Sequence, residues 1–331
     1  MNSVDKAIQD SKPAESSAKH QLALVTGGAG FIGSHLVEAL VSDGFKVRVL
    51  DSLVKGKKQS IQYLIDRGKV EFIEGDVRCR DAVDRAVKGC DYVFHLAAIQ
   101  IMESMNSPEE CIDVNIKGSY NIFRSALEHG VKRVIYSSSS SVYGDPKQLP
   151  MGEESGYNIV EPYGAAKLMG EHLLKFLSTK GLQYNALRYF NVYGERQAAH
   201  GYYTTVIIYF IKRILNNEPP VIDGKGDQSM DFTHVSDVVR ANLLAMRSRH
   251  CNDVFNVGTG VSTSIKELAD ILIEALGANV KPIFRDREVI VNRRQADTAK
   301  AEKLLGFKAK VNVKDGLTKV ARAIAKQQEL Y

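Results

Sequence analysis

The sequence lacks the features of a membrane-spanning, disulfide-linked or nucleic-acid-binding protein. No run in the chain approaches the roughly 18 apolar residues that a membrane span requires. Cysteine is scarce, and the four present form no CxxC pair and have no histidine at metal-ligand spacing: Cys79, Cys90, Cys111 and Cys251. We therefore expect reduced thiols, a cytoplasmic protein and no metal site. The formal net charge of +5 is small and no long Lys/Arg run occurs, so nucleic acid is not an expected partner.

The N-terminal residues are polar and lack the apolar core of a secretory signal. Their Ser, Ala, Lys and Glu content predicts that residues 1–20 form a disordered tail. The chain as a whole is 44% hydrophobic and 25% charged, which is ordinary for a globular protein. Its 331 residues suit one large or two modest domains with a sizeable core.

Short apolar runs alternate with helical patterns up to about residue 191. The predicted strands are "LALVTGG", "KVRVLD", "VEFIEGD", "DYVFHLAA", "RVIYSSSSS" and "YNALRYFNVYG". Helical patterns lie in "FIGSHLVEALVSDG", in a long helix "PEECIDVNIKGSYNIFRSALEHG", and over about 162–179. This alternation predicts an α/β fold with a doubly wound parallel sheet that is covered on both faces.

The alternation breaks beyond residue 192, where helices near 202–216 and 264–276 mix with short strands and loops. We predict a large domain over residues 21–191, to which a segment near 231–257 returns. A smaller, mainly C-terminal α/β lobe would comprise residues 192–230 and 258–331.

The segment "TGGAGFIG" places three glycines, Gly27, Gly30 and Gly33, between the first strand and the first helix. Glycines let the backbone turn tightly and approach a pyrophosphate, which then rests on the helix N-terminus that Phe31 and Ile32 begin. The GxxGxxG spacing is a variant of the dinucleotide-binding fingerprint. It predicts a dinucleotide site at this turn.

Asp51 ends the second strand, 18 residues after Gly33. A carboxylate there can accept hydrogen bonds from the ribose hydroxyls and would repel a 2′-phosphate, so the sequence favours NAD over NADP. Lys55 lies close enough to complicate this preference slightly.

The next two strands also end where ligands bind in such sheets, at Asp76, Val77, Leu96, Ala97 and Ala98. Asp76 can meet the adenine amino group, and the small Ala97 and Ala98 let the backbone lie close to the cofactor. His95 follows "YVF" on a buried strand, which is more typical of a hydrogen-bonded core histidine than of a catalytic base.

These features resemble the extended short-chain dehydrogenase/reductase family, in particular its NAD-dependent nucleotide-sugar epimerases and dehydratases. The segments that carry the resemblance are, in order, "VTGGAGFIGSHLV", "HLAA", "SSSSSVYGD", "YGAAK", "RYFNVYG", "DFTHVSDV", "FNVGTG" and "ADTAKAEKLLGF". They cover nearly the whole chain from residue 22. The resemblance implies that the large domain is a Rossmann domain that binds NAD.

The resemblance assigns the family's catalytic tyrosine and lysine to Tyr163 and Lys167 in "EPYGAAK". Positions i and i+4 share one helix face, so both side chains would point at the same spot. A phenol with a pKa of about 10 is a poor base at neutral pH. A neighbouring ammonium and a positive nicotinamide ring would favour phenolate. The lysine also holds the nicotinamide ribose in the family, and the third catalytic member, four residues before the tyrosine of "VYG", is Ser139.

Four further positions match family contacts. The resemblance makes Phe190 a backbone contact to NAD, Asn115 a neighbour of the nicotinamide, and Asn191 and Arg287 contacts of the substrate diphosphate. An arginine suits the last role because its planar fork pairs with phosphate oxygens. Asn191 can equally cap a turn, and Asn115 can be a buried polar group of its helix.

The sequence departs from the family at the phosphate site. Met230 stands where an arginine usually precedes "DF", and Val289 and Ile290 replace a Gly-Asp pair after "RE". Arg293 and Arg294 can either compensate for the lost arginine or be solvated surface charge. Arg294 also aligns with the position that limits the size of the C2 substituent in the family.

The dehydratases of this family carry an Asp-Glu pair after the catalytic Ser/Thr, where this chain has Ser140 and Ser141. Without an acid, elimination of a hydroxyl has no catalyst. The remaining reaction is transient oxidation at C4: Tyr163 takes the hydroxyl proton, tightly bound NAD takes the hydride, and the keto sugar is reduced on its other face. We therefore expect a UDP-sugar 4-epimerase of nucleotide-sugar metabolism.

The identity of the sugar stays open among glucose or galactose, their N-acetyl forms and uronic acids. Gln100 stands where glucose epimerases commonly carry lysine, and Arg196 would pair with a C6 carboxylate if its loop folds over the sugar. The alternatives are an epimerase specific for UDP-glucuronic acid, an NAD-dependent decarboxylase or reductase, and a non-catalytic NAD-binding sensor. The resemblance also implies a homodimer held by a four-helix bundle, formed by the helices near 108–129 and 162–179.

Overall fold

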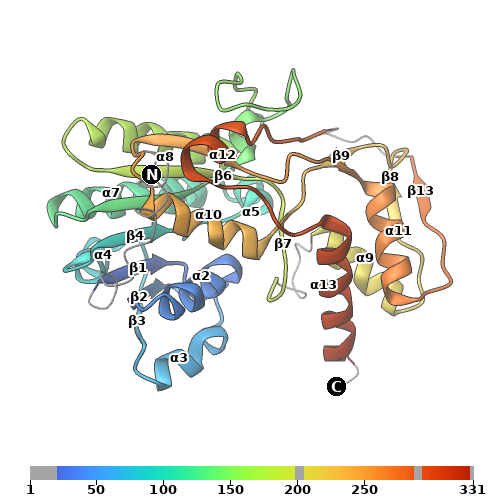
Figure 1. Ribbon diagram of the computed structural model, residues 1–331, viewed down its shortest axis with the longest axis horizontal. Coiled ribbons are helices and arrows are strands. Elements are labelled where there is room, and N and C mark those ends of the chain that lie inside the picture. The colour runs from blue at the N-terminus through green and yellow to red at the C-terminus, as the bar shows by residue number, and fades with distance from the viewer. Residues whose placement is uncertain (1–20, 198–204, 287–292, 329–331) are drawn as a thin grey trace, which may run out of the picture.

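The centre of the molecule is a seven-stranded parallel sheet with the strand order β11-β6-β5-β4-β1-β2-β3 (Figure 1). The structure, a computed structural model, describes residues 21–197, 205–286 and 293–328. The strands of this sheet are β1 (Leu22–Thr26), β2 (Lys46–Asp51), β3 (Val70–Glu74), β4 (Tyr92–His95), β5 (Arg133–Ser139), β6 (Tyr184–Tyr189) and β11 (Asp253–Val257). The predicted doubly wound α/β fold is confirmed.

Helices cover both faces of the sheet, because alternate residues of each strand point to opposite sides. In β1, Ala23 and Val25 belong to one apolar cluster and Leu24 to the other. The first cluster lies under α2 (Phe31–Ser42), α3 (Gln62–Asp66), α10 (Val235–Arg247) and α12 (Ala299–Leu305), and the second under α4 (Arg80–Val87), α7 (Ser119–Glu128) and α8 (Pro162–Ser178). Burial on both faces explains why the strands read as continuous apolar runs.

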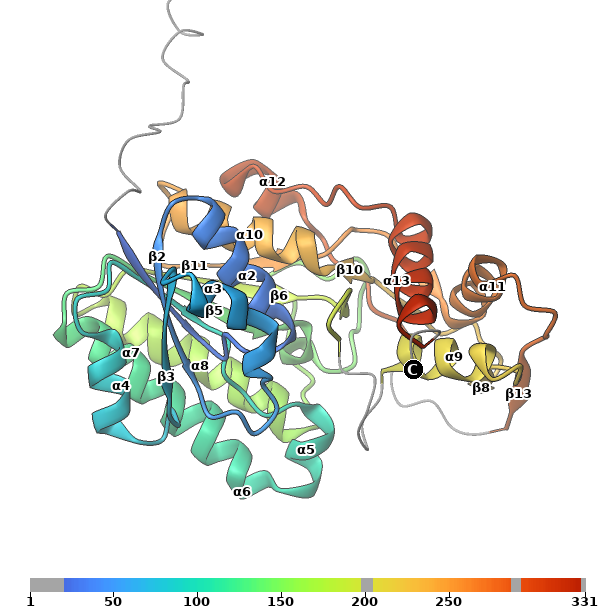
Figure 2. The same cartoon turned by 90° about the horizontal axis from the view of Figure 1, so that it is seen from below.

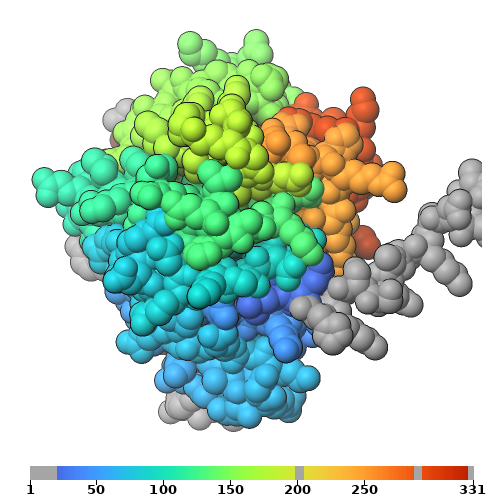
Figure 3. Space-filling model, turned by 90° about the vertical axis from the view of Figure 1, so that its left-hand side faces the viewer, coloured from blue at the N-terminus to red at the C-terminus, as the bar shows by residue number. Residues whose placement is uncertain are grey.

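The long helix predicted from "PEEC" to "LEHG" is present as three consecutive stretches. These are α6 (Pro108–Cys111), the π-helical segment η3 (Ile112–Gly118) and α7, and the short helix α5 (Ile101–Asn106) precedes them. A Cβ at Gly118 would lie 2.6 Å from Val77 Cγ2, so the π-helical segment packs closely on the loop after β3. Two 3₁₀ turns, η2 (Lys58–Ile61) and η4 (Ser140–Tyr143), complete this half of the chain. Figure 3 shows the left-hand side of the molecule in Figure 1. This face consists mostly of the first half of the chain, in blue to yellow-green, with later parts in orange and red at one edge.

A smaller lobe stands beside the sheet and has its own apolar core (Figures 1 and 2). Its helices are α9 (Val206–Leu215), α11 (Ile265–Leu276) and α13 (Val313–Gln328). Three two-stranded ladders connect and flank them: β7 (Val192–Tyr193) with β10 (Thr233–His234), β8 (Val221–Asp223) with β13 (Ile283–Arg285), and β9 (Ser229–Met230) with β12 (Thr263–Ser264). No helix in these parts of the chain is both long and apolar enough to cross a membrane.

The chain passes between the large domain and the smaller lobe more often than the predicted domain boundaries state. α10 and β11 pack into the large sheet, in the segment near 231–257. The predicted lobe boundary at residue 258 puts residues 299–307 in the smaller lobe. In the structure, Ala301, Leu305 and Phe307 instead lie in the core of the large sheet, where α12 contacts β11 and α10. Apolar residues at helical spacing predict a helix here but do not tell which core covers it.

An ion pair buried in the large domain connects β6 to α8. The side chains of Arg188 and Glu171 are 2% and 6% exposed. Arg188 Nε donates to Glu171 Oε1 at 2.9 Å, and Arg188 Nη2 donates to Glu171 Oε2 at 2.7 Å. The remaining guanidinium hydrogens reach the Tyr143 hydroxyl at 2.9 Å, the Glu153 carbonyl at 3.0 Å and the Tyr157 hydroxyl at 3.2 Å. Every arm of this arginine is therefore bonded.

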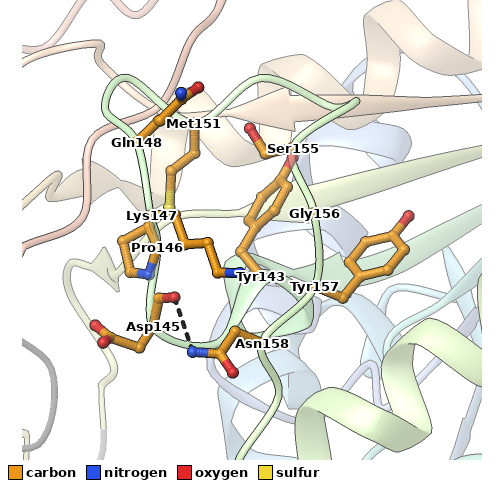
Figure 4. A pocket seen from close by; sticks show the side chains of 10 residues that line it. All are labelled: Tyr143, Asp145, Pro146, Lys147, Gln148, Met151, Ser155, Gly156, Tyr157 and Asn158. Carbon is orange, nitrogen blue, oxygen red and sulfur yellow. Dashed lines mark hydrogen bonds between the residues drawn. The ribbon is translucent and has the colours of Figure 1, made fainter.

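The same ion pair reaches the end of β5 and the loop that follows it. The Ser138 hydroxyl donates to Glu171 Oε1, which links the strand that carries Ser139 to helix α8. Tyr143 and Tyr157 line a pocket enclosed by the loop after η4, in which Asn158 donates to the Asp145 carbonyl (Figure 4). Two strands, one helix and one loop thus share a single network.

Replacing Glu171 by glutamine tests how much the fold depends on this network. Glu171→Gln leaves the Arg188 cation buried without its counter-ion, which costs about 3–5 kcal/mol of unfolding free energy. Chemical denaturation followed by circular dichroism measures this loss. The control is Asp270→Asn, which breaks the exposed Lys266–Asp270 pair of α11 and costs at most about 1 kcal/mol. Equal, small losses in the two variants would contradict the assignment.

Candidate active site

The glycine-rich turn after β1 is packed too closely for side chains. A Cβ at Gly33 would lie 2.1 Å from the Gly27 carbonyl oxygen, and one at Gly28 would lie 2.8 Å from Val49 Cγ1. Gly27 has a φ of +68°, and a Cβ there would lie 3.0 Å from the Ala97 nitrogen. The turn ends at the N-terminus of α2, which has no side-chain cap and no acidic residue in its first turn. Free N–H groups at an uncapped helix start fit a pyrophosphate.

Asp51 lies beside this turn at the end of β2. Its two carboxylate oxygens accept hydrogen bonds from Ala29 N and Leu53 N, both at 2.9 Å. Burial raises the pKa of this carboxyl, and the two backbone hydrogen bonds oppose that rise. Lys55 pairs with Glu103 at 2.5 Å, so its charge is already neutralised and does not weaken the preference for NAD.

The other strand ends complete the cleft. Asp76 forms a bidentate ion pair with Arg78, which lowers the pKa of its carboxyl, and Val77 is buried. The Leu96 and Ala97 nitrogens both donate to Thr26 Oγ1 at 3.1 Å, which holds the start of the segment Leu96–Ala98 against β1.

His95 is a core residue whose two ring nitrogens are both hydrogen-bonded. Because Thr26 Oγ1 already accepts two N–H groups, its hydroxyl donates to His95 Nδ1 at 2.7 Å. His95 Nε2 then donates to Ser119 Oγ at 2.9 Å, and Ser119 donates to the Asn115 carbonyl at 2.6 Å. Burial lowers the pKa of His95 to about 3, so the ring stays neutral.

Asn115 holds the loop that follows β4. Its side chain accepts from Ile99 N at 2.9 Å and donates to the Ile99 carbonyl at 3.0 Å. Both amide groups are therefore occupied by the backbone next to Ala97 and Ala98. These contacts favour the buried structural role over direct contact with a cofactor.

Tyr163 and Lys167 lie in the first turns of α8. Pro162 occupies the first helical position, and both oxygens of the Glu161 side chain accept from Gly164 N at 3.0 Å, which caps the helix. Lys167 Nζ donates to the Ser137 carbonyl at 2.8 Å and lies 5.6 Å from the centre of the Tyr163 ring. The Ser139 side chain accepts from Ser141 N at 3.1 Å, and its hydroxyl acts on the Tyr163 phenol, whose pKa it lowers.

Burial shifts the pKa values of both helix residues toward their neutral forms. Burial raises the pKa of Tyr163 above its usual range and outweighs the opposing hydrogen bond from Ser139. Burial also lowers the pKa of Lys167 to about 8. The sequence-based argument, in which the Lys167 ammonium and the nicotinamide ring together favour phenolate, did not include this cost of burying charge.

Three residues that the sequence places near the substrate or the cofactor, Phe190, Asn191 and Arg196, bind other parts of the chain. Asn191 has a φ of +26°, and its side chain donates to the Asp231 carbonyl at 3.2 Å, while Phe190 N donates to the Val257 carbonyl at 3.0 Å. Arg196 forms an ion pair with Glu38 of α2 at 2.6 Å, which favours its structural role over pairing with a sugar. Arg287, Val289 and Ile290 lie outside the described residues.

Arg294 reaches the catalytic loop. Its Nη1 donates to Ser140 Oγ at 3.1 Å, next to Ser139, whereas Arg293 is exposed. Met230 packs against the core of the smaller lobe. The sequence pattern could not tell which of the two arginines points inward, because they are adjacent in the sequence and no periodic pattern distinguishes them.

No group of three or more His, Cys, Asp or Glu side chains that could hold a metal occurs in the described ranges. The fold does bring Ser139, Tyr163 and Lys167 together, from the end of β5 and the start of α8.

Comparisons with known proteins agree with this geometry. The model of the NAD dependent epimerase/dehydratase family matches residues 23–258. The UDP-glucose 4-epimerase of Mycolicibacterium smegmatis is 35% identical over 306 residues, which cover 89% of this chain and 96% of that protein. A UDP-glucose 4-epimerase from Thermotoga maritima, solved with UDP-glucose, has a TM-score of 0.87 and 36% identity over 93% of this chain and all of that one (100%). A UDP-N-acetylglucosamine 4-epimerase from Methanobrevibacter ruminantium, solved with UDP-N-acetylmuramic acid, has a TM-score of 0.88 and 35% identity over 93% of this chain and 99% of that one.

A single methyl group in the glycine turn should weaken NAD binding. Gly33→Ala places a Cβ against the Gly27 carbonyl, so the turn must shift at a cost of about 1–3 kcal/mol, or about tenfold to hundredfold in affinity. Titration with NAD followed by calorimetry measures the change. Gly156→Ala is the control, because its Cβ would meet open space, and we expect unchanged affinity. Unchanged NAD affinity in Gly33→Ala would contradict the assignment of this turn.

Proposed function

Because the chain belongs to the NAD-dependent epimerase/dehydratase family, we propose that it is a UDP-sugar 4-epimerase. The observation that carries this proposal is the convergence of Ser139, Tyr163 and Lys167 without an acid that could drive elimination. NAD is the cofactor, and when bound it would supply the hydride acceptor and donor that the inversion at C4 needs. The reaction has no net redox change.

The chain's own residues hold the C4 hydroxyl and move its proton. Tyr163 takes this proton and returns it when the hydroxyl is re-formed, and the Ser139 hydroxyl, which acts on the Tyr163 phenol, orients both. Lys167, fixed by the Ser137 carbonyl, supplies the nearby positive charge that favours phenolate. Gly27, Gly30, Gly33, Asp51 and the start of α2 would hold NAD.

The surroundings of Ser139 argue against a dehydratase. Ser140 donates no proton as readily as a carboxylic acid, and its hydroxyl accepts a hydrogen bond from Arg294. The nearest carboxyl on α8, Glu161, is occupied as the cap of that helix. Among the described residues next to Ser139, a hydroxyl leaving group would therefore meet no carboxylic acid in the place where the dehydratases carry one.

The UDP portion of the proposal rests on the relatives and on the segment after β6. Asn191 and Arg287 are the proposed diphosphate contacts, with Arg287 outside the described residues. Incubation with a panel of UDP-sugars, followed by NMR detection of the C4 epimer, tests the whole proposal. Accumulation of free NADH or carbon dioxide without an epimer would instead indicate a reductase or decarboxylase, and no turnover at all would indicate an NAD-binding sensor.

Removal of the phenol hydroxyl tests the mechanism. Tyr163→Phe should lower kcat by about a hundredfold to ten-thousandfold, the usual contribution of a positioned acid–base group. Bound NAD and the unfolding midpoint should stay unchanged. Tyr209→Phe, on an exposed face of α9, is the matched control and should retain full activity. Full activity in Tyr163→Phe would exclude this mechanism.

We also propose that two copies pair through α5, η3 and α8, which contact one another and lie along one side of the large domain (Figure 2). These elements expose large apolar side chains that a partner would cover: Met102, Met105, Ile112, Met169 and Phe176. An exposed apolar patch of this kind is typical of an interaction surface. The cysteines are free thiols, which suits the proposed cytoplasmic location.

A charge in this patch should separate the copies. Met169→Glu would place a carboxylate in the proposed interface, and we expect the dimer to become a monomer in sedimentation velocity. Ile283→Glu introduces the same charge at an exposed apolar position of β13 in the smaller lobe and should stay dimeric. A wild-type protein that sediments as a monomer would rule out the dimer.

A further inference from the structure

Arg294 is a cation of the smaller lobe that lies beside the reacting groups of the large domain. Its Nη1 donates to the Ser140 hydroxyl at 3.1 Å, and Ser140 directly follows Ser139, whose hydroxyl acts on the Tyr163 phenol. The guanidinium thus lies against the loop that carries the catalytic serine. Glu161, two residues before Tyr163, is the first of the acids whose charge acts on it. These two contacts put Arg294 on the side of the site where the sugar reacts.

No carboxylate in the described part of the chain forms an ion pair with Arg294. Its single side-chain hydrogen bond is to a neutral hydroxyl, although a guanidinium carries five donors. The nearest acids are Glu161 and Asp145, which act on it only over a longer distance. Both Glu161 oxygens already accept from Gly164 N. Among the described residues, the Arg294 guanidinium therefore keeps N–H groups that have no acceptor.

The environment of Arg294 disfavours an uncompensated charge. Burial lowers the pKa of its guanidinium, and Glu161 and Asp145 offset this only in part. A partly buried cation without a counter-ion is an unfavourable arrangement that a bound anion relieves. The guanidinium can offer a carboxylate two parallel N–H groups, whereas a neutral hydroxymethyl group cannot use this fork.

Hydrogen bonds fix the backbone of Arg294 and of the two residues after it, while Ser140 holds the guanidinium. Arg294 N donates to the Ser229 carbonyl at 2.9 Å, and Ser262 Oγ donates to the Arg294 carbonyl at 3.3 Å. Ala296 N donates to the buried Asp231 carboxylate at 3.2 Å, and Met151 N donates to the Gln295 carbonyl at 2.8 Å. A pre-positioned donor loses little freedom when a ligand binds.

We propose that Arg294 binds a carboxylate of the sugar, so that the substrate class of this site is UDP-linked acidic sugars, of which UDP-glucuronate is the simplest probe. This inference rests on the proposed function for the position of the sugar. The sequence suggested Arg196 for the contact with the sugar carboxylate. Because the Arg196 guanidinium is paired with Glu38, we assign this contact to Arg294 instead. The Ser140 hydroxyl orients the guanidinium and separates it from the Tyr163 phenol.

Calorimetry with UDP-glucuronate and UDP-glucose tests this assignment. Wild-type protein should bind UDP-glucuronate at least about tenfold more tightly, as expected for a charge-assisted pair. Arg294→Met keeps the length of the side chain but removes the charge, and it should abolish this preference. Arg294→Lys, which keeps the charge without the fork, should retain part of it. Arg293→Met removes the same charge from the exposed neighbour and should leave the ratio of the two affinities unchanged.

Two results would overturn the assignment: equal affinities of the wild type for the two ligands, or a preference that persists in folded Arg294→Met and Arg294→Lys. Binding and turnover separate this inference from the proposed function. If the wild type prefers UDP-glucuronate and loses this preference in Arg294→Met, but C4 is not inverted in either ligand, the epimerase proposal fails and the role of Arg294 stands.

Discussion

The candidate active site depends on the ion pair between Arg188 and Glu171, which fixes α8 against β5 and β6. Tyr163 and Lys167 are on α8, whereas Ser139 ends β5, so their alignment requires the helix and strand to keep one register. Glu171 sets that register by binding Arg188 and Ser138 at once. A buried pair is costly to desolvate, and its value here is that only one arrangement satisfies all of its hydrogen bonds.

The cofactor cleft is shaped by a second set of buried hydrogen bonds that leads away from β1. Thr26 binds both the loop after β4 and His95. His95 binds Ser119, which binds the Asn115 carbonyl, and the Asn115 side chain binds Ile99 in the same loop. The π-helical segment η3 places Asn115 at this loop and Gly118 against Val77, in the loop after β3. Polar residues of a parallel sheet are thus used to hold the loop at its carboxyl edge, where the ligand binds.

The sequence predicts those parts of the molecule that local spacing determines. The apolar runs predict the strands, the glycine spacing predicts the turn, and "EPYGAAK" predicts a helix start with Tyr163 and Lys167 on one face. Pairings across the fold are not predictable in this way. Nothing in the order of residues indicates that Arg196 meets Glu38, that α12 covers the large sheet, or that Arg294 and not Arg293 turns toward Ser140. The spacing of residues likewise does not predict that Asn115 binds the Ile99 backbone.

Burial acts against every charge at the reacting end of the site. It raises the pKa of Tyr163 and lowers the pKa values of Lys167 and Arg294. Burial therefore opposes ionisation at this end of the site, and a ligand that brings negative charge to Lys167 and Arg294 would raise their pKa values again. A more fully charged Lys167 would in turn favour the phenolate of Tyr163. An anionic substrate would therefore help to prepare the base that acts on it, which makes binding selectivity and proton transfer two consequences of the same burial.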